Sequence, residues 1–242
     1  MKSCAKSAAV VALCLLLCAP AASVSAADAC SNYGINSHLP SPTDLDKIKA
    51  AGFDWIRVDF NWWAMEPSNN NFQWGQTDPV VNKAHALGLN IFATLSYTPQ
   101  WAAADQNCQN GAGGDNGCNG KPFASVAEWQ DFVSTVTSRY AGKINHWGMW
   151  NEPNLDHFYH GTEDQYVYDI LGPGAQAAKG ANPAAVILGP ELAGVTKSDD
   201  WNGDEGICLF GGCIFNGWEV SLANVLDKGG EHIDIITHHF YT

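Results

Sequence analysis

The feature that most constrains the fold is a regular alternation of short apolar runs with longer amphipathic segments. The apolar runs have strand length, and the segments between them have the spacing and end signals of helices. Such alternation predicts parallel strands joined by right-handed crossovers. The predicted strands are 33–36, 55–60, 90–95, 144–150, 186–188 and 233–240, and the predicted helices are 42–51, 78–87, 126–140, 163–181 and 217–228.

Units of this kind fit either a doubly wound sheet or part of an eight-stranded barrel. A doubly wound dinucleotide-binding sheet needs a glycine-rich turn after its first strand, and none follows here. Polar and aromatic residues instead follow the strands, at Asn61, Tyr97, Asn151, Glu152 and Tyr241. Because barrel enzymes place function at the carboxyl ends of their strands, we predict an α/β fold, a (β/α)8 TIM barrel truncated after about strand six.

Charge narrows the class of partner. The chain has 12 lysines and arginines against 25 aspartates and glutamates. This balance argues against nucleic acid and anionic membranes as partners and favours an uncharged substrate. Aromatic residues make up 11% of the chain, with ten tryptophans. Tryptophan faces stack on sugar rings but also fill cores, and packing is slightly favoured for any single one.

Residues 1–26 have the pattern of a secretory signal peptide. Lys2 and Lys6 form a basic start, residues 8–18 are apolar but too short to span a bilayer, and small residues precede a cleavage site after Ala26. We therefore expect residues 27–242 to form one partial barrel domain of a secreted protein, extracellular or periplasmic. Cys18 follows leucines, which disfavours a lipid anchor.

The cysteines that remain after cleavage predict disulfide bonds, because secretion is oxidising. Cys108 and Cys118 would close a loop rich in glycine and asparagine, and Cys208 and Cys213 would close a shorter one. Cys30 is left over, with a partner outside the sequence or a free thiol.

The stretch 144–154, INHWGMWNEPN, carries the fourth predicted strand into a polar end. Pro153 fixes its own φ and pushes Glu152 out of the helical region, so the chain turns here. Glu152 is then expected at a strand end among aromatic residues, a setting that favours the protonated carboxyl of a general acid. An ordinary surface carboxylate is the disfavoured alternative.

These motifs resemble those of the retaining glycoside hydrolases of clan A, which are built on a (β/α)8 barrel. Residues 150–154 (WNEPN) resemble the acid/base signature after strand four, and 239–241 (HFY) resemble the His-x-Tyr motif after strand six. Arg57 matches an arginine found on strand two of many members. Residues 97–101 (YTPQW) favour family 39-like and family 5-like enzymes, which act on β-xylosides, β-glucans and related glycans.

The resemblance implies retaining hydrolysis by two carboxyl groups about 5–5.5 Å apart, without a cofactor. Glu152 would protonate the leaving oxygen and then deprotonate the attacking water, while Asn151 would hydrogen-bond the 2-hydroxyl of the sugar. The nucleophile of the clan is a glutamate at the end of strand seven, which we expect beyond Thr242. We therefore expect an N-terminal fragment that is inactive and poorly stable alone.

The residues expected to bind an oligo- or polysaccharide substrate lie at strand ends or on the rim that follows them. They are Arg57, Tyr97, Trp101, Trp150, Asn151, His239 and Tyr241, with Trp101 and Trp150 as the candidates for sugar stacking. Arg57 either positions the nucleophile or pairs with Asp59. Glu66 and Glu191 are expected to be solvated loop residues, with substrate contact as the less favoured alternative for Glu191. His238, on the other face of its strand, is expected to be structural.

Two other functions stay open. A non-catalytic carbohydrate-binding relic would keep the aromatic rim without a second carboxylate. A metal-dependent hydrolase on the same barrel is the weaker alternative, because His146, His157 and His160 show no ligand spacing such as HExxH. The sequence does not indicate an oligomeric state.

Overall fold

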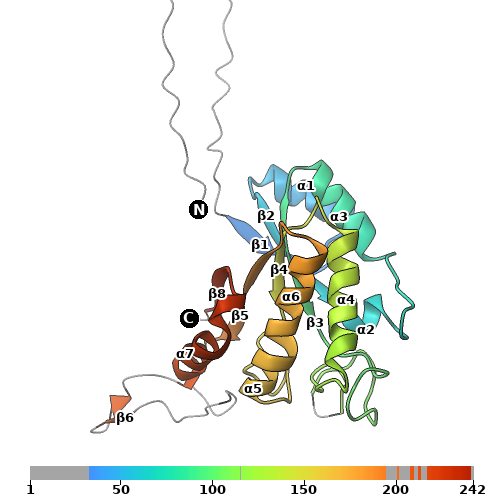
Figure 1. Ribbon diagram of the computed structural model, residues 1–242. Helices are drawn as coiled ribbons and strands as arrows, with labels where there is room; N and C mark the ends of the chain where they lie inside the picture. The colour runs from blue at the N-terminus through green and yellow to red at the C-terminus, as the bar shows by residue number, and fades with distance from the viewer. Residues whose placement is uncertain are drawn as a thin grey trace, which may run out of the picture. The chain divides into compact units, whose positions relative to one another are not determined.

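Six parallel strands form one curved sheet in the order of their sequence (Figure 1). The strands are β1 (Gly34–Asn36), β2 (Trp55–Asn61), β3 (Asn90–Ser96), β4 (His146–Met149), β5 (Val186–Ala193) and β8 (Ile235–His239). A doubly wound sheet reverses its strand order at a switch point, whereas a barrel keeps the order sequential. The sheet is therefore part of a (β/α)8 barrel, as predicted.

The computed structural model describes residues 33–114, 116–194, 201, 208–209, 212–213 and 217–240, all within a unit that begins at residue 32. The predicted signal peptide, Cys30 and Tyr241 lie outside the described residues, and so do the side chains of Cys208 and Cys213. The backbones of these two cysteines pair in an antiparallel hairpin of β6 (Cys208–Leu209) and β7 (Gly212–Cys213). No helix in the described ranges is long and apolar enough to cross a membrane.

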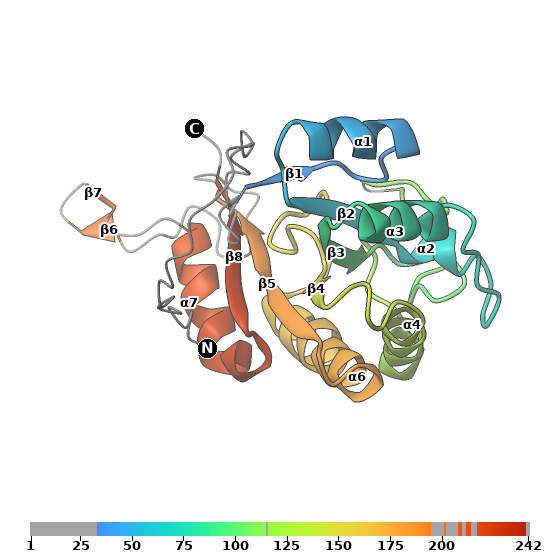
Figure 2. The same cartoon turned by 90° about the horizontal axis from the view of Figure 1, so that it is seen from above.

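The helices cover the convex side of the curved sheet (Figure 2). They are α1 (Pro42–Ala50), α2 (Trp62–Met65), α3 (Thr77–Ala86), α4 (Val126–Arg139), α5 (Glu163–Gln165), α6 (Gly172–Ala181) and α7 (Gly217–Gly229). The predicted helix 163–181 is helical throughout but changes type, because a π-helical segment at Tyr166–Leu171 lies between α5 and α6 and ends directly before Gly172-Pro173-Gly174, where a kink was expected.

The hydrophobic core lies between the sheet and these helices. Alternation along β2 sends Ile56, Val58 and Phe60 into the core, where each is completely buried. From α4, Phe132, Val133 and Val136 meet them, also completely buried. One face of the sheet packs against the helices in this core. The functional side chains are therefore expected on its other face.

Helix α1 begins at a serine cap. Ser41 is the N-cap, and its Oγ accepts from the backbone N–H of Asp44 at 3.2 Å. Pro42 occupies the first helical turn, where its missing N–H costs nothing. Proline also keeps the residue before it extended, so the cap falls on Ser41.

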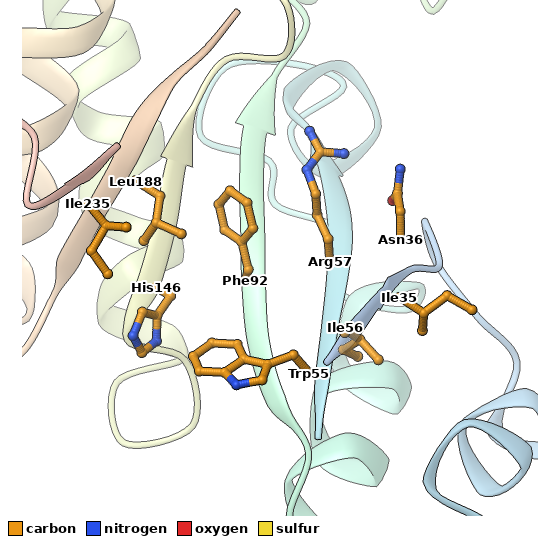
Figure 3. A pocket seen from close by; sticks show the side chains of 10 residues that line it. Ile35, Asn36, Trp55, Ile56, Arg57, Phe92, His146, Leu188 and Ile235 are labelled. Carbon is orange, nitrogen blue, oxygen red and sulfur yellow. The ribbon is translucent and has the colours of Figure 1, made fainter. Parts of the chain in front are cut away.

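The concave face of the sheet carries the opposite set of side chains (Figure 3). Near the amino-terminal ends of the strands, this face lines an open hollow of about 470 Å³. The residues around it include Trp55, Phe92, His146, Leu188 and Ile235. The rings of Trp55 and His146 meet edge to face at 4.7 Å. Arg57 lies on the same face, and in Figure 3 its guanidinium points toward the carboxyl ends of the strands.

Candidate active site

Polar side chains from separate strands converge at the carboxyl edge of the sheet. Arg57 comes from β2, Tyr97 follows β3, Asn151 and Glu152 follow β4, and His239 ends β8. The carboxyl ends of parallel barrel strands meet at one face, which explains how residues distant in sequence come together.

Arg57 connects several of these side chains by hydrogen bonds. Its Nη2 donates to Asn151 Oδ1 at 2.8 Å and to Glu191 Oε2 at 2.7 Å, and its Nε donates to the same Oε2 at 3.1 Å. Its Nη1 lies 3.3 Å from Asp59 Oδ1, so the expected pairing with Asp59 is present but longer. Asn151 donates in turn from Nδ2 to Tyr97 Oη at 3.3 Å. The Asn151 amide is therefore held from both sides.

Glu191 is the residue that the sequence interpretation placed wrongly. The prediction ended the fifth strand at Leu188 and put Glu191 in a solvated loop, but β5 continues past it and its exposed fraction is 0%. The strand register shifts between Pro190 and Leu192, which marks a β-bulge. A bulge adds an unpaired residue and redirects a side chain, and here Glu191 is aimed across the sheet at Arg57.

Neighbouring strands are adapted to this buried carboxylate. Gly148 on β4 leaves the space, because a Cβ there would collide with Glu191 Oε1. Thr94 on β3 donates from Oγ1 to the two carboxylate oxygens at 3.1 and 3.3 Å. A buried charge needs a partner and hydrogen bonds, and Arg57 and Thr94 supply both. The sequence analysis had assigned no role to Thr94 or Gly148.

Glu152 is 5% exposed, and its Oε1 lies 2.7 Å from His239 Nδ1. The other ring nitrogen of His239 lies 3.6 Å from Glu191 Oε2, so one imidazole stands between two carboxylates. Burial lowers the pKa of His239, but its contacts with Glu152 and Glu191 outweigh burial and raise the pKa to about 9. His239 is therefore protonated at neutral pH: its Nδ1 donates to Glu152, and its charge forms an ion pair with Glu191.

Left-handed backbone conformations surround the site. Tyr97 has φ +75°, Trp150 +84°, Glu152 +45° and Glu191 +55°. Such conformations cost about 1–3 kcal/mol each for residues other than glycine and persist only where the surroundings enforce them. They lie where β3 and β4 end and where β5 bulges, the same places from which the polar side chains converge.

Trp150 does not present its ring to a sugar, which corrects the stacking role expected for it. Its exposed fraction is 0%, and its ring packs against Tyr97, Trp129 and Tyr159. Its Nε1 donates to the carbonyl of Phe158 at 3.0 Å. Trp150 therefore fixes the loop that follows β4.

Glu66 is also buried, 1% exposed, and is not the solvated residue that we expected. Its carboxylate accepts from Trp62 Nε1 and from the backbone N–H of Asn70, both at 2.7 Å. Burial raises the pKa of Glu66 despite these bonds. Its backbone carbonyl accepts from Trp101 Nε1 at 2.8 Å. This bond holds the half-buried Trp101 ring in place. Its stacking on a sugar stays a prediction.

The loop beyond β3 is closed by the predicted disulfide between Cys108 and Cys118. The loop returns to the rim, where the N–H of Thr98 donates to the carbonyl of Asn119 at 3.2 Å.

His238 stacks on Trp218 with ring centroids 4.2 Å apart. Within the described ranges, no group of three or more histidine, cysteine, aspartate or glutamate side chains is placed to hold a metal ion.

Comparison with known proteins agrees with this geometry. The model of glycosyl hydrolase family 10 matches residues 40–186, more than half of the chain. The chain belongs to glycosyl hydrolase family 10. The match covers β2 to β4 and the WNEPN segment with Glu152.

Individual relatives of this family 10 chain point the same way. It is 31% identical over 116 residues to Endo-1,4-beta-xylanase 1 of Gibberella zeae, covering 46% of this chain and 28% of that protein. It is 27% identical over 132 residues to a Beta-xylosidase of Geobacillus stearothermophilus, covering 51% and 25%. The chain thus spans about a quarter of the length of these relatives.

The solved structure of a family 39 glycoside hydrolase from Xanthomonas axonopodis superposes with a TM-score of 0.59 at 19% identity. The superposition covers 86% of this chain and 40% of that one, and it shows a shared barrel fold. The clan predicted from the sequence is confirmed. The matching family model is that of family 10, whereas the motifs had favoured family 39-like and family 5-like enzymes.

Proposed function

We propose that the whole protein is a secreted glycoside hydrolase that cleaves a β-linked glycan of the xylan type with retention of configuration. The observation that carries this proposal is the Asn151–Glu152 pair, held at a barrel rim by Arg57 and His239. The xylanase and xylosidase names of the relatives support a β-xylosidic substrate. Secretion rests on the signal-peptide pattern of residues 1–26.

Glu152 is the acid/base in this proposal. It protonates the oxygen of the leaving sugar and later takes a proton from the attacking water. The bond from His239 fixes the orientation of the carboxyl group, and the charge of His239 stabilises the carboxylate that remains after the proton is given away. Burial keeps competing water away from this step.

Asn151 binds the substrate in this proposal. Its amide is held by Arg57 on the oxygen side and by Tyr97 on the nitrogen side, so it cannot rotate freely. A fixed donor and acceptor beside the acid/base suits the 2-hydroxyl of a sugar, where a hydrogen bond strengthens as the transition state forms.

The nucleophile is proposed to come from a part of the protein beyond Thr242. Glu191 is unsuited to attack a sugar, because its side chain is 0% exposed and ion-paired with Arg57 at 2.7 Å. The strands β1 and β8 stand at the two edges of the sheet, where further barrel strands would pair. Retention requires a second carboxyl group about 5–5.5 Å from Glu152.

The test is Glu152→Gln in the complete secreted protein, assayed on two aryl β-xylosides that differ only in their leaving group. Phenyl β-xyloside needs acid assistance, so its kcat/KM is expected to fall by about 10²–10⁴-fold. The corresponding value for 2,4-dinitrophenyl β-xyloside is expected to fall far less, because that leaving group departs without a proton.

Glu231→Gln is the matched control, since the Glu231 side chain is 71% exposed and lies before β8 rather than after it. It is expected to leave both rates unchanged. An equal loss on both xylosides in Glu152→Gln would contradict the acid role. A parent protein that binds xylobiose but hydrolyses no β-xyloside would support the carbohydrate-binding relic instead.

A further inference from the structure

Glu191 is buried, charged and in contact with both cationic side chains of the site. We propose that Glu191 is a positioning residue for the reaction, an inference that rests on the function proposed above. Its carboxylate orients Arg57 and His239. Through them it holds the Asn151 amide and the Glu152 carboxyl group in place.

The first step of this inference concerns the guanidinium. Glu191 Oε2 accepts from both Nε and Nη2 of Arg57, which fixes the plane of the group. The same Nη2 donates to Asn151. Without the Glu191 carboxylate, Arg57 keeps Asp59 as its acidic partner, 3.3 Å from Nη1. The guanidinium is then expected to turn toward Asp59 and release Asn151.

The second step concerns His239. The charged and titratable groups that face it are Glu152 after β4, Glu191 on β5, Arg57 on β2 and His238 on its own strand. The two carboxylates favour the imidazolium and Arg57 opposes it. Without the Glu191 charge, the pKa of His239 falls. A neutral imidazole carries no charge, so it can no longer form ion pairs with the carboxylates on its two sides.

A purely structural ion pair is the competing explanation. Such a pair would not need Glu191, because Asp59 already lies beside Arg57. The chain nevertheless forms a bulge at Glu191, holds it at a φ of +55° and places Gly148 opposite its carboxylate. These features let one carboxylate reach the arginine of β2 and the histidine of β8 together, which an ion pair with Arg57 alone does not require.

The experiment is Glu191→Gln in the complete protein, read by the NMR titration of the histidine rings. The chain has eight histidines, and His239→Gln identifies the resonance by its disappearance. The pKa of His239 is expected to fall by about one unit or more, a tenfold change in proton affinity. Glu66→Gln is the matched control, because Glu66 is also a buried glutamate but accepts from Trp62 and Asn70. It is expected to leave the pKa of His239 unchanged.

A second readout is turnover of 4-nitrophenyl β-xyloside. Glu191→Gln is expected to lower kcat about tenfold or more with little change in KM, because positioning acts on the transition state. Glu191→Asp keeps the charge and is expected to restore part of both the titration and the rate. If Glu191 were only structural, its substitutions would not change the pKa of His239 and kcat together.

The proposal is overturned if folded Glu191→Gln titrates His239 as the parent does. If that variant does not fold, Arg57→Gln combined with Glu191→Gln removes both charges. The pKa of His239 should still fall, because the contributions of Glu191 exceed that of Arg57, and an unchanged value overturns the proposal. The titration needs no turnover, so an inactive parent would refute the proposed hydrolase without deciding the role of Glu191.

Discussion

His239 gives the stability of this protein a pH dependence whose sign follows from its contacts. Its pKa is about 9 in the folded chain against an ordinary value of 6.5, so the folded state holds the proton more tightly. The stabilisation is complete below pH 6.5 and is lost as the pH rises through 9. The difference of 2.5 units corresponds to about 3 kcal/mol.

This magnitude needs little reduction for solvent screening, because the His239 side chain is 20% exposed and its partner Glu152 7%. The assay is denaturant unfolding of the complete protein and of His239→Gln, at about pH 6 and about pH 10. Other groups titrate in both proteins, so their effects cancel in the difference between the two free energies of unfolding.

The parent is expected to exceed His239→Gln in stability at the lower pH, and this advantage should shrink by about 3 kcal/mol at the higher pH. An advantage of the same size at both pH values would refute the reasoning, because it would mean that His239 binds its proton equally in both states. An advantage that grows with pH would reverse the sign of the linkage.

Two further predictions concern the scaffold of the complete protein. Phe132→Ala removes a completely buried ring that stacks on Trp62 at 5.3 Å, so it should lower the free energy of unfolding by about 3–5 kcal/mol in denaturant titrations. Ser138→Ala, on the exposed side of the same helix, should change it by less than about 0.5 kcal/mol, and equal losses would contradict the assigned core. Cys108→Ser with Cys118→Ser opens a loop with a sequence separation of 10 and should cost about 2–3 kcal/mol. A reductant should lower the stability of the parent and leave that double variant unaffected; an equal response of both proteins would refute the disulfide contribution.

Much of the scaffold was predictable from hydrophobic period alone. Each apolar run became a strand of the sheet, with ends displaced by a few residues at most for β1 to β4. Helix α4 was predicted to within one residue, because its buried positions follow a helical spacing. The rim residues Asn151 and Glu152 were found because a proline after a strand forces the chain to turn.

Glu191 was missed because Gly189 and Pro190 are ordinary signals for the end of a strand. The apolar pair Leu192 and Ala193, directly after Glu191, was the signal that the strand continues. A bulge depends on the pairing of β5 with β8, a contact between distant segments that local patterns do not contain.

The burial of Trp150 was unpredictable for a related reason. Its cover comes from a loop that folds back, with the Phe158 carbonyl bonded to its indole and the Tyr159 ring against its edge. Glu66 is likewise buried by its own loop, where Asn70 caps the carboxylate. Local sequence indicated that these residues follow strands, but tertiary packing decided which of them face solvent.

The role of Glu152 is tested most directly by azide rescue of Glu152→Ala in the complete protein. The variant is expected to hydrolyse 2,4-dinitrophenyl β-xyloside slowly, since the glycosyl intermediate forms but no base activates water. Azide needs no base, so it should accelerate turnover and yield the β-xylosyl azide, identified by NMR. An α-azide, or a variant whose rate azide does not change, would contradict a retaining mechanism with Glu152 as its acid/base.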